Sequence, residues 1–243
     1  KWISKNRLNK GWDRTINNNP PQDLEYEKTF LPFILLSKKR YIGDKYEFSC
    51  DEKPKRTSMG IVMKRRDNAP IVKYVYGNLL EIIMNQKDLI KAKNWLIKTL
   101  QQIVSEKMDM SYFIISKSLR GYYKNPDSIA HKVLADRIAE REPGNKPKPN
   151  DRIPYAYIKI DESKWEDPEN LGYYKSGKNK GKAKSRKILQ GDRIEHPDFI
   201  NKNKLKLDYN LYISNQIMNP VKQLLDLGID SKETEDIFNK ILI

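Results

Sequence analysis

The strongest constraint on the fold is a pair of segments whose apolar residues recur at helical spacing. The first segment follows Pro70 and places its apolar residues at Val72, Val75, Leu79, Ile82 and Ile83. The second begins near Asp88 and places its apolar residues at Leu89, Leu96, Leu100, Ile103 and Val104. This spacing is typical of amphipathic helices that pack on a core. We therefore expect two helices, with Asp67 or Asn68 capping the first and Pro70 in its first turn.

Three further helices are predicted from capping residues that precede apolar stripes. Their expected starts are Asp127 or Ser128, Asp208 or Asn210, and Asp230. The apolar residues of the first are Ile129, Val133, Leu134 and Ile138. The second is expected to run through Leu227. The third carries Glu233 three residues after its cap, an arrangement that resembles a capping box.

Three short strands are predicted as well. Residues 24–30 nearly alternate between apolar and polar side chains, which indicates a half-buried strand. Leu31-Pro32 interrupts the pattern, and residues 33–42 predict a second strand that is apolar at its start and basic at its end. These two would form a strand pair that ends near Gly43-Asp44. Another short strand is expected over Arg152–Ile160.

The remaining segments are expected to be irregular. The first twenty residues are polar, and residues 50–59 are charged, so both are expected to be loops. Residues 143–150 contain three prolines, which remove hydrogen-bond donors and fix φ. Residues 172–187 hold seven basic side chains and no acidic one, which predicts an exposed loop. The predicted fold class is α+β, with a small β unit over residues 1–66 followed by a larger, mainly helical unit over residues 67–243.

Composition indicates a folded and strongly basic protein. The 47 Lys and Arg residues outnumber the 32 Asp and Glu residues, so the net charge is +15, and a polyanion is the expected partner. The 4 Trp, 14 Tyr and 6 Phe residues exclude a disordered basic tail. Cys50 is the only cysteine, which excludes a disulfide scaffold or a cysteine-based zinc site. No apolar run reaches the roughly 18 residues of a membrane span. Because the chain begins at Lys1, we expect a fragment or a processed piece.

Two basic clusters are candidates for phosphate contacts. On the strand predicted over residues 33–42, Lys38 and Arg40 would face one way, and Lys39 and Tyr41 the other. Such cations suit phosphates and minor-groove acceptors, although lysines also protect edge strands from aggregation. The second cluster, just before a helix start, comprises Lys64, Arg65 and Arg66. Arginines beside a helix N-terminus can hold a phosphate, and Asp67 can pair with one of them, but an ordinary solvated charge run is the commoner case.

Scattered basic residues follow along the chain, at Lys117, His131, Arg137, Arg141 and Arg152. A hydrogen-bonded or surface role is expected for His131 rather than that of a catalytic base. His131 and His196 are the only histidines, so a histidine-based metal centre is unsupported. The sequence also contains no P-loop, GxSxG or HExxH motif, and therefore no complete active site.

Glu25 and Glu27 are the candidate metal ligands. Side chains two positions apart on a strand share a face, so these carboxylates would lie close together. Two close carboxylates repel each other, so a cation usually accompanies them. A divalent metal ion, Lys28 or a neighbouring arginine could be that cation. A solvated strand face remains the alternative.

Taken in order, these motifs closely resemble the end of the palm and the thumb of B-family DNA polymerases. The matching segments are Leu24–Lys28, Lys38–Tyr41, Arg65–Asn68, Ile115–Leu119, His131–Arg137, Arg141–Gly144, Asp151–Tyr155, Gly191–Glu195 and Tyr212–Ile217, continuing to Pro220. The resemblance is collinear over roughly residues 23–227. Eukaryotic polymerase delta and the polymerases of nucleocytoplasmic large DNA viruses are most similar. Ser58–Val62 and the basic segment 172–187 favour the viral group.

The resemblance implies roles for the basic clusters. Residues 1–66 correspond to the C-terminal edge of the palm and residues 67–243 to the thumb. The residues implied in DNA binding are Lys38, Lys39, Arg40 and Tyr41 in the minor-groove motif, Lys64, Arg65 and Arg66 at the start of the thumb, and Lys117, Arg137 and Arg152 near the DNA backbone. Glu25 and Glu27 match acidic palm residues beside the catalytic carboxylates, where an additional metal ion can bind.

The resemblance also implies which parts are missing. The YGDTDS-type motif with the catalytic aspartates should lie just before Lys1, so the two Mg²⁺ ions would be held mostly by an upstream part. The chain alone should therefore be inactive, either as an excised fragment or as one piece of a split polymerase. Its implied partners are primer–template DNA, the N-terminal polymerase part and a sliding-clamp-type processivity factor. Its implied location is the nucleus or a cytoplasmic viral replication site. A stand-alone, noncatalytic nucleic-acid-binding module is the alternative.

Overall fold

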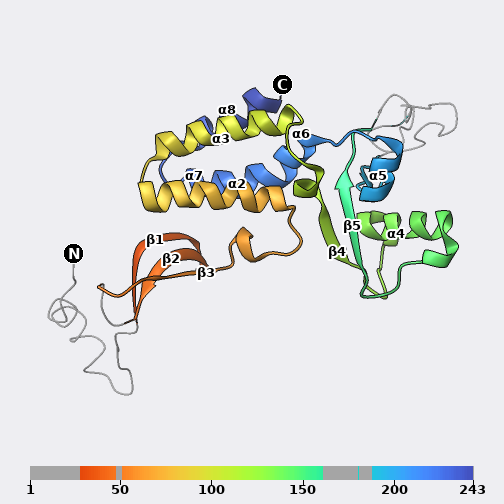
Figure 1. The fold of residues 1–243 in the computed structure, drawn as a ribbon, viewed down its shortest axis with the longest axis horizontal. Helices are drawn as coiled ribbons and strands as arrows, with labels where there is room; N and C mark the ends of the chain where they lie inside the picture. The colour runs from red at the N-terminus through yellow and green to blue at the C-terminus, as the bar shows by residue number, and fades with distance from the viewer. Residues whose placement is uncertain (1–27, 48–50, 161–179, 181–187, 243) are drawn as a thin grey trace, which may run out of the picture. The chain divides into compact units, whose positions relative to one another are not determined.

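The computed structural model describes residues 28–47, 51–160, 180 and 188–242 (Figure 1). The chain divides into two compact units, residues 1–60 and residues 61–243, and each is described by itself. Both contain antiparallel strands, and the second contains long helices, so the predicted α+β class is confirmed. The predicted boundary after residue 66 lies near this division. The assignment of the units to palm edge and thumb stays a prediction.

The first unit is built on one antiparallel sheet in the order β1-β2-β3. Its strands are β1 (Thr29–Ser37), β2 (Arg40–Tyr46) and β3 (Lys55–Met59). The prediction of one strand over residues 33–42 is wrong, because the chain reverses between Ser37 and Arg40, which pair with each other. The expected interruption at Leu31-Pro32 is also wrong. This peptide bond is cis and lies within β1, where the register shifts between Phe30 and Phe33.

The strand β3 replaces part of the loop that was predicted over residues 50–59. Its side chains are polar apart from Met59, so the apolar alternation that marks a strand is absent. Backbone pairing with β2 creates the strand instead, in a register that joins Tyr41 to Met59 and Lys45 to Lys55. Gly60 follows with φ +61°, and a Cβ there would lie 2.3 Å from the carbonyl oxygen of Lys39. The end of β3 therefore packs directly on the β1–β2 turn.

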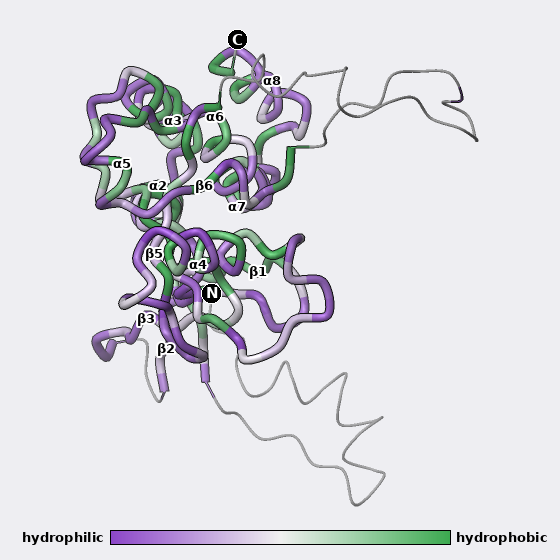
Figure 2. Tube along the Cα trace, turned by 90° about the vertical axis from the view of Figure 1, so that its right-hand side faces the viewer, coloured by the Kyte–Doolittle hydropathy of each residue, from purple (hydrophilic) through white to green (hydrophobic). Residues whose placement is uncertain are grey.

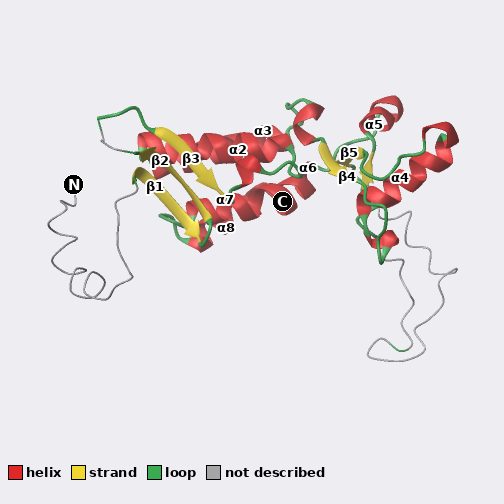
Figure 3. Ribbon diagram, turned by 90° about the horizontal axis from the view of Figure 1, so that it is seen from below, coloured by secondary structure: helices red, strands yellow, loops and turns green. Residues whose placement is uncertain are grey.

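The core of the second unit is a group of helices that lie side by side (Figures 1 and 3). They are α2 (Pro70–Glu81), α3 (Leu89–Val104), α7 (Met218–Leu225) and α8 (Ser231–Leu242). Hydrophobic and hydrophilic residues are interspersed along these helices (Figure 2), and most residues of the predicted apolar stripes are buried. The inward placement of Val104 is wrong, because this residue lies at the last position of α3 and is 39% exposed. Leu79, Leu96 and Leu100 are fully buried. Each such side chain stabilises the fold by about 2 kcal/mol.

Helix starts agree with the sequence where a carboxylate accepts a backbone N–H. Asp88 caps α3 through Lys91 N at 2.8 Å, and Asp230 accepts from Lys232 N at 2.8 Å before α8. The predicted caps of the other two helices are wrong. The N-cap of α2 is Ala69, because Asp67 is engaged elsewhere. The N-cap of α4 is Ile129, since Asp127 and Ser128 lie in the preceding turn η5 (Pro126–Ser128).

Two π-helical turns widen the helices of the second unit. One, η3 (Ile82–Gln86), continues α2, and the other, η9 (Ile213–Ile217), joins α6 (Tyr209–Tyr212) to α7. The single helix predicted from Asp208 or Asn210 through Leu227 is therefore three consecutive segments. Asp208 caps the first by accepting from Leu211 N at 2.9 Å.

A second sheet, in the order β4-β5-β6, carries several of the predicted site residues. Its strands are β4 (Ile115–Ser118), β5 (Arg152–Tyr157) and β6 (Ile194–Glu195), with α4 (Ala130–Arg141) and α5 (Pro197–Asn203) beside them. The strand predicted from Arg152 is confirmed. Residues 143–150 form only the short turn η6 (Pro143–Asn145), as expected from their prolines.

The buried hydroxyl of Tyr212 connects this sheet to the helices. It accepts a hydrogen bond from Tyr157 N at 2.9 Å and donates one to the carbonyl of Phe113, at the end of η4 (Met110–Phe113). The rings of Phe113, Tyr157 and Tyr212 pack edge to face around it, with centroids 4.9 and 5.0 Å from that of Tyr212. Strands β4 and β5 are thereby fixed at one end of the helical core.

Substitution of Gly60 should weaken the first sheet. Gly60→Ala would force a Cβ against the carbonyl of Lys39 and disfavour the positive φ, so we expect a loss of about 1–3 kcal/mol in the free energy of unfolding. Urea denaturation measures this loss. Gly144→Ala is the matched control, because no heavy atom lies within 4 Å of the added Cβ. Equal stability of the two variants would contradict the packing described.

Candidate nucleic-acid interface

The tip of the first hairpin presents two lysines. Lys38 and Lys39 form the turn between β1 and β2, and both are exposed. Neither makes a hydrogen bond or ion pair with any residue in the described part of the chain. The sequence placed Lys38, Lys39 and Arg40 on opposite faces of one strand, which is wrong because Lys39 has φ +61° and reverses the chain. The two lysines instead project from a turn, and half-buried Arg40 begins β2.

Tyr41 lies in an aromatic cluster on one face of this sheet. Its ring centroid is 5.9 Å from that of Phe30 and 5.7 Å from that of Phe33. Cross-strand pairing places Leu35 and Met59 on either side of it, and both are exposed. The cluster supports the base of the hairpin, so the lysine turn stands on a rigid element.

The three cations before α2 differ in their surroundings. Lys64 ends the turn η2 (Val62–Lys64) and is exposed. Arg65 donates to both carboxylate oxygens of Asp67, with Nε–Oδ1 3.0 Å and Nη2–Oδ2 2.7 Å. The pairing of Asp67 with one arginine is thus confirmed, and it lowers the pKa of this carboxyl. Arg66 is exposed and makes no hydrogen bond or ion pair within the residues that the structure describes.

Lys117 connects this segment to the second sheet. It lies on β4, half-buried, opposite Ile153 of β5. Its charge contributes, after that of Arg65, to lowering the pKa of Asp67, so the two segments are close in space. On the neighbouring strand, Arg152 donates from Nε to Ser116 Oγ at 3.1 Å and from Nη2 to the Ser116 carbonyl. The fold therefore brings together residues that are far apart in the sequence.

His131 is held by hydrogen bonds beside these cations. Its Nε2 lies 3.1 Å from the Tyr123 hydroxyl, which accepts from Arg120 N at 2.7 Å. Burial lowers the pKa of His131, and the charges of Lys117 and Arg120 lower it further, against a hydrogen bond with the Ser118 backbone. The imidazole is therefore neutral at pH 7. This is the hydrogen-bonded histidine expected from the sequence.

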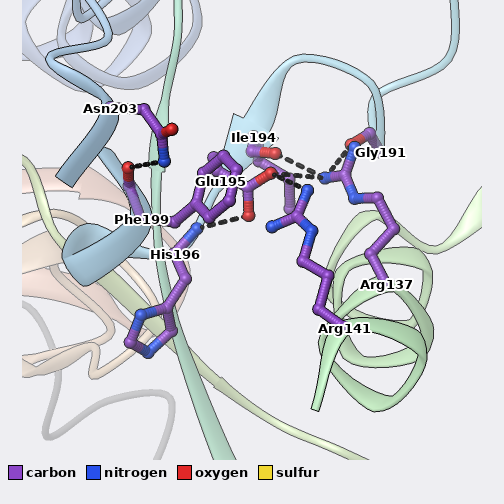
Figure 4. A network of polar contacts seen from close by, with 8 residues as sticks. All are labelled: Arg137, Arg141, Gly191, Ile194, Glu195, His196, Phe199 and Asn203. Carbon is purple, nitrogen blue, oxygen red and sulfur yellow. Dashed lines mark hydrogen bonds and ion pairs between the residues drawn. The ribbon is translucent and has the colours of Figure 1, made fainter. Parts of the chain in front are cut away.

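Arg137 points inward, into a polar network around Glu195 (Figure 4). Its Nη2 donates to the carbonyls of Gly191 at 2.9 Å and Ile194 at 2.6 Å, and lies 3.9 Å from Glu195 Oε2. Arg137 Nε is buried and has no hydrogen-bond partner among the described residues. The side chain thus anchors α4 to the segment before β6. Contact of Arg137 with DNA stays a prediction.

The carboxylate of Glu195 is the centre of this network, and sequence reasoning missed it. Its side chain is only 4% exposed, Arg141 Nη2 lies 3.0 Å from Oε2, and His196 N donates to Oε1 at 2.9 Å. The guanidinium of Arg141 also stacks 3.8 Å above the ring of Phe199. The sequence gives no signal for this role, because the two arginine partners of Glu195 lie more than fifty positions earlier in the chain.

No metal centre is formed within the described ranges. They contain no group of three or more His, Cys, Asp or Glu side chains that could hold a metal ion. Glu25 and Glu27 lie outside the described residues, and so do the first twenty residues and all of the basic segment 172–187 except Lys180. No helix in the described part is both long and apolar enough to span a membrane.

Comparison with known proteins decides the family. The model of DNA polymerase family B matches residues 6–227. The chain belongs to this family. It is 47% identical to a DNA polymerase of Acanthamoeba polyphaga mimivirus over 232 residues, which are 95% of this chain and 12% of that protein. It is 47% identical to a DNA polymerase of Pyramimonas orientalis virus over 209 residues, 86% of this chain and 16% of that protein.

A eukaryotic relative completes the comparison. The chain is 30% identical to the DNA polymerase delta catalytic subunit of Caenorhabditis elegans over 208 residues, 85% of this chain and 17% of that protein. The resemblance to polymerase delta and to the polymerases of large DNA viruses is therefore confirmed. The chain spans only 12–17% of the length of these relatives.

Neutralising Glu195 should destabilise the second unit strongly. Glu195→Gln removes the buried negative charge beside half-buried Arg137 and exposed Arg141, so both guanidinium groups lose their anionic partner. We expect a loss of about 1–3 kcal/mol in the free energy of unfolding, measured by urea denaturation. Asp136→Asn is the control, because it breaks only an exposed ion pair with Lys132 and should cost under about 0.5 kcal/mol. A loss no larger than that of the control would show that Glu195 holds nothing in place.

Titration of His131 should make stability depend on pH. Because its pKa is lowered from the ordinary value of 6.5, the unfolded chain binds a proton at higher pH than the folded chain does. The free energy of unfolding should therefore be highest above pH 6.5 and fall as the pH drops toward the folded pKa. The variant His131→Gln, which cannot titrate, should lose less stability between about pH 7.5 and pH 5.5. Identical losses in the two proteins, measured by urea denaturation, would contradict this account.

Proposed function

We propose that this chain is the C-terminal palm edge and thumb of a replicative DNA-directed DNA polymerase, and that it holds primer–template duplex during nucleotidyl transfer. The observation that carries the proposal is the exposed lysine turn of a family B polymerase, built on a rigid hairpin. Lys38 and Lys39 have no partner among the described residues and are available to a phosphate. The family membership does not favour a stand-alone, noncatalytic binding module.

The grip on DNA is proposed to be electrostatic and independent of sequence. The net charge of +15 favours a polyanion, and each phosphate that a lysine or arginine neutralises releases counterions. In the first unit, Lys38 and Lys39 would make direct contacts, supported by Arg40 and Tyr41. In the second unit, Arg66 would make a direct contact, with Lys64 two positions before it. Lys117, Arg65 and Arg152 would form a second patch, in which Asp67 and Ser116 hold the two arginines in fixed orientations. Arg137 would act through α4, which it anchors.

The chemistry is proposed to reside in an upstream part of the enzyme. In-line transfer of a nucleotide needs carboxylates that hold two Mg²⁺ ions, and the described residues provide no such group. Glu25 and Glu27 remain the candidates for an additional metal ion from this chain. The proposed partners are primer–template DNA, the N-terminal polymerase part and a sliding-clamp-type processivity factor. The proposed place of action is the nucleus or a cytoplasmic viral replication site.

Removal of the two turn lysines tests whether they contribute to DNA binding. In the full polymerase, Lys38→Ala combined with Lys39→Asn removes both charges, while Asn tolerates the positive φ at position 39. We expect weaker primer–template binding, a salt dependence less steep by about 1.8 in slope, and reduced primer extension. Fluorescence anisotropy at several salt concentrations measures the slope.

The control for this experiment removes the same charge elsewhere. Lys98→Ala combined with Lys232→Ala changes two exposed lysines, one on α3 and one on α8. These two helices pack on each other in the helical core. It should leave extension and the salt slope nearly unchanged. If the turn variant and the control behave alike, the lysine turn does not grip DNA.

A further inference from the structure

The connection between β4 and α4 protrudes from the second unit and carries an uncovered aromatic ring. Tyr122 is 81% exposed, the largest exposed fraction among the large apolar side chains that the structure describes. Arg120, Gly121 and Lys124 around it are exposed as well. No acidic residue occurs between Asp109 and Asp127. Tyrosine and arginine together on a surface are typical of binding sites.

The side-chain charges of this connection have no partner in the part of the chain that the structure describes. The side chains of Arg120 and Lys124 form no hydrogen bond or ion pair with any described residue. Arg65 and Arg152, by contrast, are bonded to Asp67 and Ser116. The positive charge at the connection is therefore directed to solvent and available to an anionic partner.

The connection is nevertheless fixed at both ends. At its start, Leu119 exchanges backbone hydrogen bonds of 2.8 Å with Asn150 and Asp151. At its middle, the Tyr123 hydroxyl binds Arg120 N at 2.7 Å and His131 Nε2 at 3.1 Å. At its end, Ser128 Oγ donates to the Asn125 carbonyl at 2.8 Å. A protruding segment that is already ordered loses little entropy on binding.

The same surface continues into the candidate interface. Burial is the main cause of the lowered pKa of His131, and the charges of Lys117 and Arg120 lower it further, so both cations lie near this imidazole. Lys117 in turn acts on Asp67, the partner of Arg65. Cations of the second unit thus occur in the segment before α2, on β4 and in this connection.

We propose that residues 119–125 form a second contact with duplex DNA, in which Arg120 and Lys124 bind backbone phosphates and Tyr122 packs against the deoxyribose–phosphate chain. Tyr123 and His131 are positioning residues that hold the contact in shape. The partner is the sugar–phosphate backbone, because Arg120 and Lys124 are exposed and have no side-chain partner among the described residues, and exposed Tyr122 lies between them in the sequence. This inference rests on the proposed function.

Anisotropy with the full polymerase and a labelled primer–template tests the contact. Tyr122→Ala should raise Kd about tenfold, the order found for aromatic contacts to nucleic acid. Arg120→Ala combined with Lys124→Ala should raise Kd and reduce the salt slope by about 1.8. Lys232→Ala, on α8, is the control and should change neither. Circular dichroism verifies that the exposed substitutions leave the fold intact.

The outcomes separate this contact from the proposed function. If the unmodified polymerase binds primer–template tightly and both loop variants match it in Kd and slope, the contact is refuted and the proposed function stands. If the unmodified polymerase does not bind, both are refuted. Loss of affinity for single-stranded template alone, with duplex affinity unchanged, would also overturn the assignment to duplex DNA.

Discussion

The second unit depends on one buried hydroxyl group. The Tyr212 hydroxyl accepts a hydrogen bond from Tyr157 N and donates one to the carbonyl of Phe113, and both of these residues are buried. An unmet buried polar group costs about 1–3 kcal/mol, so these bonds specify a single arrangement of helices and sheet. The position of β4 and β5, and with it that of Lys117 and Arg152, follows from this junction.

The arginines and lysines of the chain fall into two classes that composition cannot separate. Arg137 and Arg141 are used internally, where Glu195 and backbone carbonyls compensate their charge. Lys38, Lys39 and Arg66 face solvent without such partners in the described ranges. The net charge of +15 counts both classes alike, but only the second class is available to bind another molecule. The internal arginines contribute by keeping α4 in place.

The sequence predicts the helices well because apolar residues at helical spacing are mostly the residues that become buried. Leu79, Leu96 and Leu100 are examples. It fails at the first hairpin, since a Lys-Lys turn has none of the Gly or Asn residues that mark a tight reversal. It also fails at β3, where pairing with β2 rather than side-chain pattern makes the strand. The site is predicted only as separate clusters. The convergence of those in the second unit, and the role of Glu195, arise from contacts between residues distant in sequence.

The π-helical turn between α6 and α7 has a consequence for length variation in this part of the family. Each residue advances a helix by about 100°, and the widened turn over Ile213–Ile217 accommodates one residue more than an α-helical turn would. This extra residue sets the rotation at which Val221 and Leu224 meet the core after Tyr212 has been placed. Loss of a single residue here would rotate the following helix by about a quarter turn and expose its apolar face. Chain length across this turn is thus as tightly constrained as any core side chain.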